Sequence, residues 1–397
     1  MNKPLFSLII LCYRKFEHLY SAINSALEQD YPNIELIISD DDSPEFPRSD
    51  IEAYIARKKG KNITSVLIRQ EEINCGTVRH MNHAVAASHG DYIVILAGDD
   101  AFYNEKVLSA YVEGFSRAPE NCYIEMAHTA MYDATLTEFE SYYLKPVVQK
   151  AIEKTETDSS DLLKVLIKYG ACLPSTSTCF TRTFFEKFGK FDEKYTLIED
   201  YPMHIRLAEE GWIIHFENFV AIKHRSGGIS HGRENTKRKS ILLYFADFGR
   251  MIQECTLPRM SLLEPKERDR VLCRANQDLL WIRLLLARSN GLLGTILALG
   301  LRHPLLAFSY VVSKVGPWAA IWHRRLFAPM LALLAFSPEM IQMFETVLPF
   351  STQFVPGLTN GLRVVICVLW LLCRIFAWMD AIKAKMNHYS GYWLSIN

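Results

Sequence analysis

The sequence predicts an α/β fold, with a mostly parallel sheet flanked by helices and a mainly α-helical C-terminal region. Two observations predict this class. Short apolar runs alternate with helical patterns over the first half of the chain, and a long helical pattern followed by proline-broken apolar stretches occupies the end. With 397 residues, the chain has room for two domains. We therefore predict a first domain at 1–235 and a helical region at 236–397.

The predicted strands are apolar runs of strand length, at residues 6–12, 34–39, 64–69, 92–96 and 123–127. Between the first two, Phe16, Leu19, Ile23 and Leu27 recur at helical spacing, and a Tyr-Pro-Asn turn ends that helix. Further helices are predicted at 49–57, 77–88, 105–116 and 262–289. The polar stretch 141–160 has no pattern, and we interpret it as a mobile loop near a ligand site or as a plain surface connection.

Composition narrows the class of protein. The formal net charge is zero, so nothing in the balance points to a nucleic-acid partner. The nine cysteines are odd in number and scattered, without zinc-ligand spacing, which favours a reducing cytosol. The N-terminal apolar run of about seven residues is too short for a signal peptide. No run reaches the ~18 apolar residues of a membrane span, and Arg374 interrupts the nearest.

Carboxylates follow two of the predicted strands. Ser-Asp-Asp-Asp-Ser at 39–43 follows the second, and Leu-Ala-Gly-Asp-Asp at 96–100 follows the fourth. In open α/β sheets, ligands bind at the carboxyl ends of the strands, so these acids can meet a nucleotide and a divalent cation. Asn74 and Gly76 open a helix that faces the same strand ends. An Asp-rich turn is the alternative for the first motif.

In order and spacing, three segments resemble glycosyltransferase family 2, which has the GT-A fold, a Rossmann-like nucleotide-binding mixed sheet flanked by helices. The segments are SLIILCYRKFEHLYSAINSALEQDYPNIELIISDDDS, NCGTVRHMNHAVAASHGDYIVILAGDD and IEDYPMHIRLAEEGW. The resemblance covers roughly residues 5–232 and implies an enzyme with a nucleotide-diphosphate sugar donor.

The resemblance also implies site residues. The nucleotide-sugar contacts that we carry over are Cys12, Tyr13, Asp40, Asp41, Asn74, Gly76, Arg79, Asn82 and Asp99. Asp99 matches the metal-binding carboxylate of the family's DxD element, and Asp100 and His224 are the further metal candidates, for Mn²⁺ or Mg²⁺. His231 is an alternative to His224, and a solvated loop histidine is the plain reading of either. The chain departs from the family pattern at Ala97 and Met81.

Asp200 matches the acidic residue that acts as general base in inverting members, with Glu199 beside it. A sugar hydroxyl is a poor nucleophile at neutral pH, so a carboxylate must take its proton. A metal ion stabilises the charge that gathers on the diphosphate leaving group. The alternative for Asp200 is a helix cap.

The resemblance implies an inverting hexosyltransferase that uses a nucleotide-diphosphate sugar, with a UDP-sugar favoured. The acceptor is expected to be a glycan or polyprenyl-linked hydroxyl in surface polysaccharide synthesis, such as O-antigen or capsule. A dinucleotide oxidoreductase or a sugar nucleotidyltransferase would need glycines after the first strand, and residues 12–16 contain none. A non-catalytic glycan-binding or scaffold protein remains the alternative. The chain has no QxxRW string, which favours one sugar per encounter.

The C-terminal segment predicts membrane association. Residues 288–397 hold nine Lys and Arg against three acids, a net +6. Basic, aromatic and proline-broken sequence suits attachment to an anionic membrane surface, here the inner face of the cytoplasmic membrane. A buried helical subdomain or a dimer interface is the alternative, which leaves a homo-oligomer open.

Overall fold

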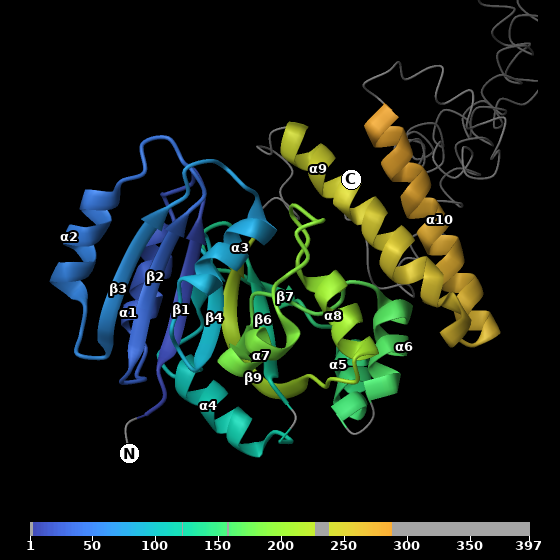
Figure 1. Cartoon of the computed structure of the whole chain (residues 1–397), viewed down its shortest axis with the longest axis horizontal. Helices are drawn as coiled ribbons and strands as arrows, with labels where there is room; N and C mark the ends of the chain where they lie inside the picture. The colour runs from blue at the N-terminus through green and yellow to red at the C-terminus, as the bar shows by residue number, and fades with distance from the viewer. Residues whose placement is uncertain (1–2, 121, 157–158, 227–237, 288–397) are drawn as a thin grey trace, which may run out of the picture. The chain divides into compact units, whose positions relative to one another are not determined.

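The computed structural model describes residues 3–120, 122–156, 159–226 and 238–287 (Figure 1). Residues 1–286 form one compact unit, and 287–397 are assigned to a second. The predicted boundary after residue 235, His231 and the predicted membrane-associated segment all lie outside the described residues. Within the described ranges, no helix has both the length and the apolar character needed to cross a bilayer.

A nine-stranded mixed sheet forms the centre of the first unit, in the order β3-β2-β1-β4-β8-β6-β9-β5, with β7 paired to β6. The strands β3, β2, β1 and β4 run parallel, β8 runs antiparallel to both β4 and β6, and β6 and β9 run parallel to each other. The strands are β1 (Phe6–Cys12), β2 (Ile34–Asp40), β3 (Ile63–Gln70), β4 (Tyr92–Ala97), β5 (Ala101–Phe102), β6 (Ile124–Tyr132), β7 (Phe139–Tyr142), β8 (Thr178–Thr181) and β9 (His215–Arg225).

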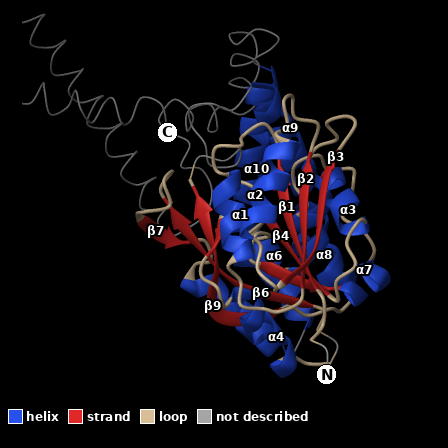
Figure 2. Ribbon diagram, turned by 90° about the vertical axis from the view of Figure 1, so that its left-hand side faces the viewer, coloured by secondary structure: helices blue, strands red, loops and turns tan. Residues whose placement is uncertain are grey.

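Helices cover both faces of the sheet, which explains why β1 and β2 are almost continuously apolar. Leu8, Ile10, Leu36 and Ile38 face one layer that includes α1, α2 and α4, and α3 lies on the opposite face (Figure 2). The helices are α1 (Leu19–Leu27), α2 (Arg48–Lys58), α3 (Thr77–Ala86), α4 (Val107–Arg117), α5 (Pro146–Glu153), α6 (Ser159–Tyr169), α7 (Arg182–Phe188), α8 (Asp200–Glu209), α9 (Arg238–Met251) and α10 (Pro265–Ala287), with short turns η1 (Lys154–Glu156), η2 (Ile252–Thr256) and η3 (Leu257–Leu262).

The α/β prediction is confirmed, and one local prediction is wrong. The stretch 141–160 is neither a mobile loop nor a plain connection, because it contains the end of β7, the helix α5 and the turn η1. Pro146 occupies the first turn of α5, where a missing N–H costs nothing. Val148 and Ile152, four residues apart, are fully buried and anchor the helix.

Candidate active site

The carboxyl ends of several strands meet at one edge of the sheet. In register, Cys12 at the end of β1 lies opposite Asp40 on β2, and Leu11 lies opposite Ala97 on β4. Because β8 runs antiparallel to both β4 and β6, the ends of β6 and β9 come to this same edge. The two Asp-rich segments therefore flank the end of β1, as the sequence predicted.

Asp41 holds the loop that precedes α3. Its carboxylate accepts hydrogen bonds from the Asn74 side chain at 2.9 Å and from the backbone N–H groups of Cys75 at 2.9 Å and Gly76 at 3.0 Å. Gly76 has a φ of +83°, a conformation that glycine adopts without strain. Asp41 is only 4% exposed, so it positions this loop through hydrogen bonds and offers little free carboxylate surface.

Asp40 and Cys12 were predicted to contact the nucleotide sugar, but the side chains of both residues lie in the interior. The Asp40 carboxylate accepts hydrogen bonds from the Ser43 N–H at 2.7 Å, the Ser43 hydroxyl at 2.6 Å and the Gln70 amide at 3.0 Å. Burial and the neighbouring Asp40 raise the pKa of the Cys12 thiol well above its usual range. Both residues therefore stabilise the ends of β1 and β2 from the protein interior.

Tyr13 is 38% exposed at the end of β1, where a donor can reach it. Arg79 and Asn82 were predicted to contact the nucleotide sugar, and in the structure their side chains bind the segment that contains Phe191 and Glu193. The Asn82 amide donates to the Phe191 carbonyl and to Glu193, each at 3.0 Å, and accepts from the Phe191 N–H at 3.0 Å. The Arg79 guanidinium lies 3.5 Å from the Glu193 carboxylate. These two residues join α3 to the segment that leads to Asp200.

Asp99 and Asp100 occupy different environments after β4. Asp100 is fully buried, and its two carboxylate oxygens face the Arg225 N–H at 2.9 Å and the His224 Nδ1 at 2.8 Å. Asp99 is half-buried, and burial together with the charge of Asp100 raises its pKa. Burial works against a charged His224, but the Asp100 carboxylate outweighs it and raises the pKa of His224. Asp100 thus orients His224 through a hydrogen bond, whereas the sequence predicted Asp100 itself as a metal ligand.

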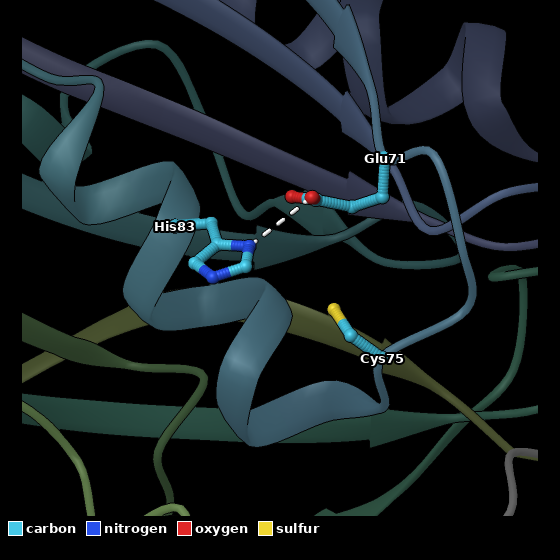
Figure 3. Close-up of side chains that lie close together, drawn as sticks. All are labelled: Glu71, Cys75 and His83. Carbon is cyan, nitrogen blue, oxygen red and sulfur yellow. Dashed lines mark ion pairs between the residues drawn. The ribbon is translucent and has the colours of Figure 1, made fainter.

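A second polar cluster lies after β3, where Glu71, Cys75 and His83 turn toward one another (Figure 3). Their ligand atoms all lie within 4.8 Å of one another, which Asp99, Asp100 and His224 do not achieve among the described residues. His83 Nδ1 lies 3.1 Å from Glu71 Oε2. Burial and a hydrogen bond to Asp41 raise the pKa of the Cys75 thiol to about 12, so this thiol is a protonated donor to the Asp41 carboxylate. Of the three residues, Cys75 is the one bonded to the Asp41 carboxylate, while Glu71 and His83 pair with each other.

Glu199 and Asp200 stand together at the start of α8. Burial raises the pKa of both, and the Asp200 charge raises that of Glu199 further. Glu199, at the N-cap position, makes no capping hydrogen bond, whereas the Asp200 carboxylate accepts a hydrogen bond of 2.6 Å from the Tyr201 N–H in the first turn, so a role of Asp200 at the helix start stays the alternative. Burial of Tyr244 on α9, together with the charges of the two carboxylates, raises the pKa of Tyr244 to about 12. This pair is a group that can hold a proton near neutral pH.

The segment before Asp200 packs on α3 and α9. The Thr196 carbonyl accepts a hydrogen bond of 3.2 Å from the Val78 N–H, and a Cβ on Gly76 would lie 2.6 Å from the Thr196 methyl group. Asp247 of α9, which is 4% exposed, accepts hydrogen bonds from the N–H groups of Thr196 and Leu197. Sequence reasoning missed Asp247, because an acid in the middle of a helix carries no local signal.

Comparison with known proteins identifies the family of the segment that forms most of this sheet. Residues 7–169 match the family model described as glycosyl transferase family 2. This segment belongs to that family. Together with the observed mixed sheet, the match confirms the predicted GT-A fold and a glycosyltransferase domain. Asp200 and His224 lie beyond the matched residues.

Several curated relatives are named as glycosyltransferases. An uncharacterized glycosyltransferase of Rickettsia typhi is 28% identical over 222 residues, 56% of this chain and 64% of the relative. A second, of Rickettsia felis, is 25% identical over 60% of this chain and 36% of the relative. A glycosyl transferase of Escherichia coli K12, named for colanic acid biosynthesis, is 31% identical over 25% of this chain and 34% of its own length. The chain thus spans less than two thirds of the length of each of these relatives.

Solved structures give weaker likenesses. Staphylococcus aureus TarS 1–349 in complex with UDP-GlcNAc aligns with a TM-score of 0.47 at 16% identity, over 79% of this chain and 80% of that one. The mannosyltransferase PcManGT of Pyrobaculum calidifontis, in complex with GDP-Man and Mn²⁺, aligns with a TM-score of 0.48 at 12% identity, over 96% and 88%. Both TM-scores lie below 0.5, so neither likeness bears on the donor or the metal of the present chain.

Proposed function

We propose that this protein is an inverting glycosyltransferase that moves a hexose from a nucleotide-diphosphate sugar, with a UDP-sugar favoured, to a hydroxyl of a glycan or polyprenyl-linked acceptor in surface polysaccharide synthesis. The observation that carries the proposal is the Glu199–Asp200 pair, whose preceding segment touches the Asp41-held loop through Thr196 and Gly76. The proposed proton acceptor is thereby in contact, through this segment, with the loop proposed to bind the nucleotide sugar. The name of the Escherichia coli relative supports a polysaccharide acceptor.

In the proposed reaction, Asp200 accepts the proton of the acceptor hydroxyl as the oxygen attacks the anomeric carbon from the side opposite the leaving diphosphate. A raised pKa suits this role, because a base acts best when its pKa lies near the working pH. Glu199 beside it raises the cost of a second negative charge and so favours proton uptake. Tyr13 and the Asp41-held loop are proposed to bind the nucleotide. A single displacement of this kind inverts the anomeric centre.

The family implies a divalent cation, and the residues at the end of β4 fit one in part. Asp99 offers a half-buried carboxylate, and His224 an imidazole that Asp100 orients, and Mn²⁺ accepts both ligand types. When bound there, Mn²⁺ or Mg²⁺ would offset the negative charge of the diphosphate. Arg225 fixes the backbone of this edge, because its guanidinium donates to the Asp99 carbonyl at 2.8 Å.

A screen of nucleotide sugars with Mn²⁺ or Mg²⁺ tests the proposal, with release of the nucleoside diphosphate as the readout. We expect one donor to be hydrolysed slowly without acceptor, and a glycosylated product of inverted anomeric configuration once an acceptor is supplied. Absence of turnover with every donor, while the fold is intact, would favour the glycan-binding or scaffold alternative.

We also propose peripheral attachment to the inner face of the cytoplasmic membrane, supported by the +6 charge of residues 288–397. Removal of residues 290–397 is expected to shift the protein from the membrane to the soluble fraction. High salt should release the intact protein only in part, since apolar burial persists when charges are screened. An intact protein found wholly soluble without detergent would contradict this proposal.

A further inference from the structure

A strip of exposed aromatic rings lies beside the candidate site. We define the aromatic strip as Tyr103, Tyr132, Phe139 and Tyr142. Tyr103, Phe139 and Tyr142 are 38%, 51% and 50% exposed, which is high for rings of this size. The Phe139 ring makes edge-to-face contacts with Tyr132 at 5.8 Å and with Tyr142 at 5.1 Å between centroids.

The strip is held by a rigid hairpin between β6 and β7. Asp133 at the turn accepts hydrogen bonds from the N–H groups of Thr135 at 3.1 Å, Thr137 at 2.8 Å and Glu138 at 2.9 Å. Its own N–H donates to the Glu138 carbonyl at 3.0 Å. A turn with these bonds holds the rings in place before any ligand arrives, which lowers the entropic cost of binding.

The hairpin is tied to the metal-binding edge of the proposed active site. Tyr132 pairs with Arg225 in the β6–β9 register, and the Ser226 N–H donates to the Tyr132 carbonyl at 2.9 Å. The Arg225 guanidinium donates both to the Asp99 carbonyl and to the Ala134 carbonyl in the turn. The strip therefore begins next to the residues proposed to hold the metal ion.

A cation lies close to two of the rings. Lys223 Nζ lies 5.4 Å from the centroid of the Tyr103 ring and 5.7 Å from that of Tyr132. The β7 residues between Phe139 and Tyr142 are Glu140 and Ser141, and all four are exposed. Rings alternate with groups that form hydrogen bonds, so this surface is not uniformly apolar.

We infer that the aromatic strip binds sugar residues of the acceptor glycan, an inference that rests on the proposed function. The C–H face of a pyranose is apolar and carries partial positive charge, which suits the negative face of an aromatic ring. Lys223 and the tyrosine hydroxyls supply hydrogen bonds to the hydroxyls or acidic groups of the same sugars. A lipid bilayer or a second apolar protein surface would leave these polar groups unpaired, at a cost.

The position of the strip determines which sugars it holds. Tyr142 pairs with Ala130, which precedes Tyr132 by two residues on β6. Tyr142 therefore lies about 7 Å farther from the sheet edge than Tyr132 does. Tyr142 is therefore placed to bind a sugar behind the reacting one, while Phe139, which pairs with Tyr132, lies nearer the sheet edge. Their loss should weaken binding of long acceptors and leave donor hydrolysis unchanged.

Direct binding of the full-length protein to an array of defined bacterial-type surface oligosaccharides, without donor, tests the inference. We expect the F139A/Y142A double variant to lose binding by about tenfold, as two ring contacts would give. V147A, which removes an exposed apolar side chain from nearby α5, is the matched control and should bind like the wild type. Aromatic replacement in F139W/Y142W should retain binding, and F139L/Y142L, which keeps apolar area without rings, should lose it.

Three outcomes would overturn the inference. They are a wild-type protein that binds no oligosaccharide on the array, a double variant that binds like the wild type, or an F139L/Y142L variant that binds fully. Loss of vesicle binding or of self-association in F139A/Y142A, with glycan binding unchanged, would assign the strip to a membrane or a second copy instead. Donor hydrolysis is measured in parallel, since failure there alone contradicts the proposed function and not the glycan contact.

Discussion

The carboxylate of Asp247 accepts a hydrogen bond of 2.6 Å from the backbone N–H of Thr196, a residue 51 positions earlier in the chain. The same oxygen accepts from the Leu197 N–H at 2.7 Å. A helix beyond the family-matched segment thus fixes the backbone just before the Glu199–Asp200 pair. Because the proposed base must sit within hydrogen-bond reach of a hydroxyl, small displacements of this backbone affect the rate.

Asp247→Ala is expected to lower kcat by as much as ~10²-fold while the KM for the donor changes little, because the base would be misplaced but the Asp41-held loop kept. Asp247→Asn retains an acceptor oxygen, so its kcat should lie between that of Asp247→Ala and that of the wild type. Steady-state kinetics checks this. Asp269→Ala, at an exposed acid of α10, is the control. A KM change without a kcat change would contradict the positioning role.

Asp200→Asn should abolish most transfer, by ~10²- to 10⁴-fold, because the amide cannot take a proton. Donor affinity should be unchanged. The folded-state pKa of Asp200 is raised, so the wild-type rate should fall as pH drops through a value above the ordinary one of about 3.9. Rate against pH and donor calorimetry check both points.

The same variant should not lose stability at neutral pH. A carboxyl whose folded pKa is raised stabilises the fold only while protonated, and this contribution is lost as pH rises through the folded pKa. Removing the Asp200 charge also removes its repulsion with Glu199, so the melting temperature should stay level or rise. Glu210→Gln, at an exposed acid next to the same helix, is the control. Near-wild-type transfer would leave Glu199 or His224 as the next candidates.

Asp99→Asn should remove metal-stimulated donor binding and leave the fold intact, because its carboxylate is half-buried at the sheet edge. Asp100→Asn should instead lower the melting temperature, because Asp100 is fully buried and holds His224 and Arg225. Calorimetry with donor and Mn²⁺ separates the two variants. Undiminished metal-dependent binding in Asp99→Asn would contradict the metal role.

Gly76→Ala should be more harmful than Gly189→Ala. Both glycines have positive φ, +83° and +86°, so alanine is strained at either. At Gly189 the new Cβ would meet nothing within 4 Å, whereas at Gly76 it would meet the Thr196 methyl group at 2.6 Å and carbonyl at 3.1 Å. Gly189→Ala should cost about 1 kcal/mol, and Gly76→Ala more, with weaker donor binding. Equal denaturation midpoints would refute the contact.

Glu125 on β6 predicts a pH-dependent stability. Both of its oxygens are buried without a hydrogen-bond partner, and burial together with the charge of Glu217 raises its pKa to about 9. The unfolded chain ionises this group near pH ~4.3, so stability should fall between that pH and about 9, by up to about 1.4 kcal/mol per pH unit. Glu125→Gln should flatten this slope, and exposed Glu120→Gln should not. Denaturant titrations from pH 5 to 9 provide the measurement.

The sequence predicted elements with a strong local pattern and missed those that depend on distant partners. The apolar runs of β1 and β4 and the helical repeat of α10 gave bounds within a few residues, because burial on both faces or on one stripe leaves a periodic trace. The short β8 and the partly exposed β9 were missed, since both are defined by pairing with β6. Tertiary pairing decided those strands.

The candidate site shows the same division. The acidic segments after β2 and β4 were correctly placed at one edge, because parallel topology brings strand ends together. The roles within each acidic segment did not follow from sequence. Asp40 and Asp100 became buried acceptors through donors on Gln70 and Arg225, and the sequence gives no sign of those pairings.

The parallel pairing of β6 with β9 has a consequence for synthesis of the protein. Ala130 lies in register with Lys223, 93 residues later, and a chain emerges at about 5–20 residues per second. The β3-β2-β1-β4 half can assemble early, but the edge that carries His224 and Arg225 is absent until β9 arrives. During that interval β6 presents an unpaired strand edge, a known starting point for aggregation. A ribosome pause before residue 215 would prolong this exposure, and a nascent chain halted there would lack the imidazole proposed to hold the metal.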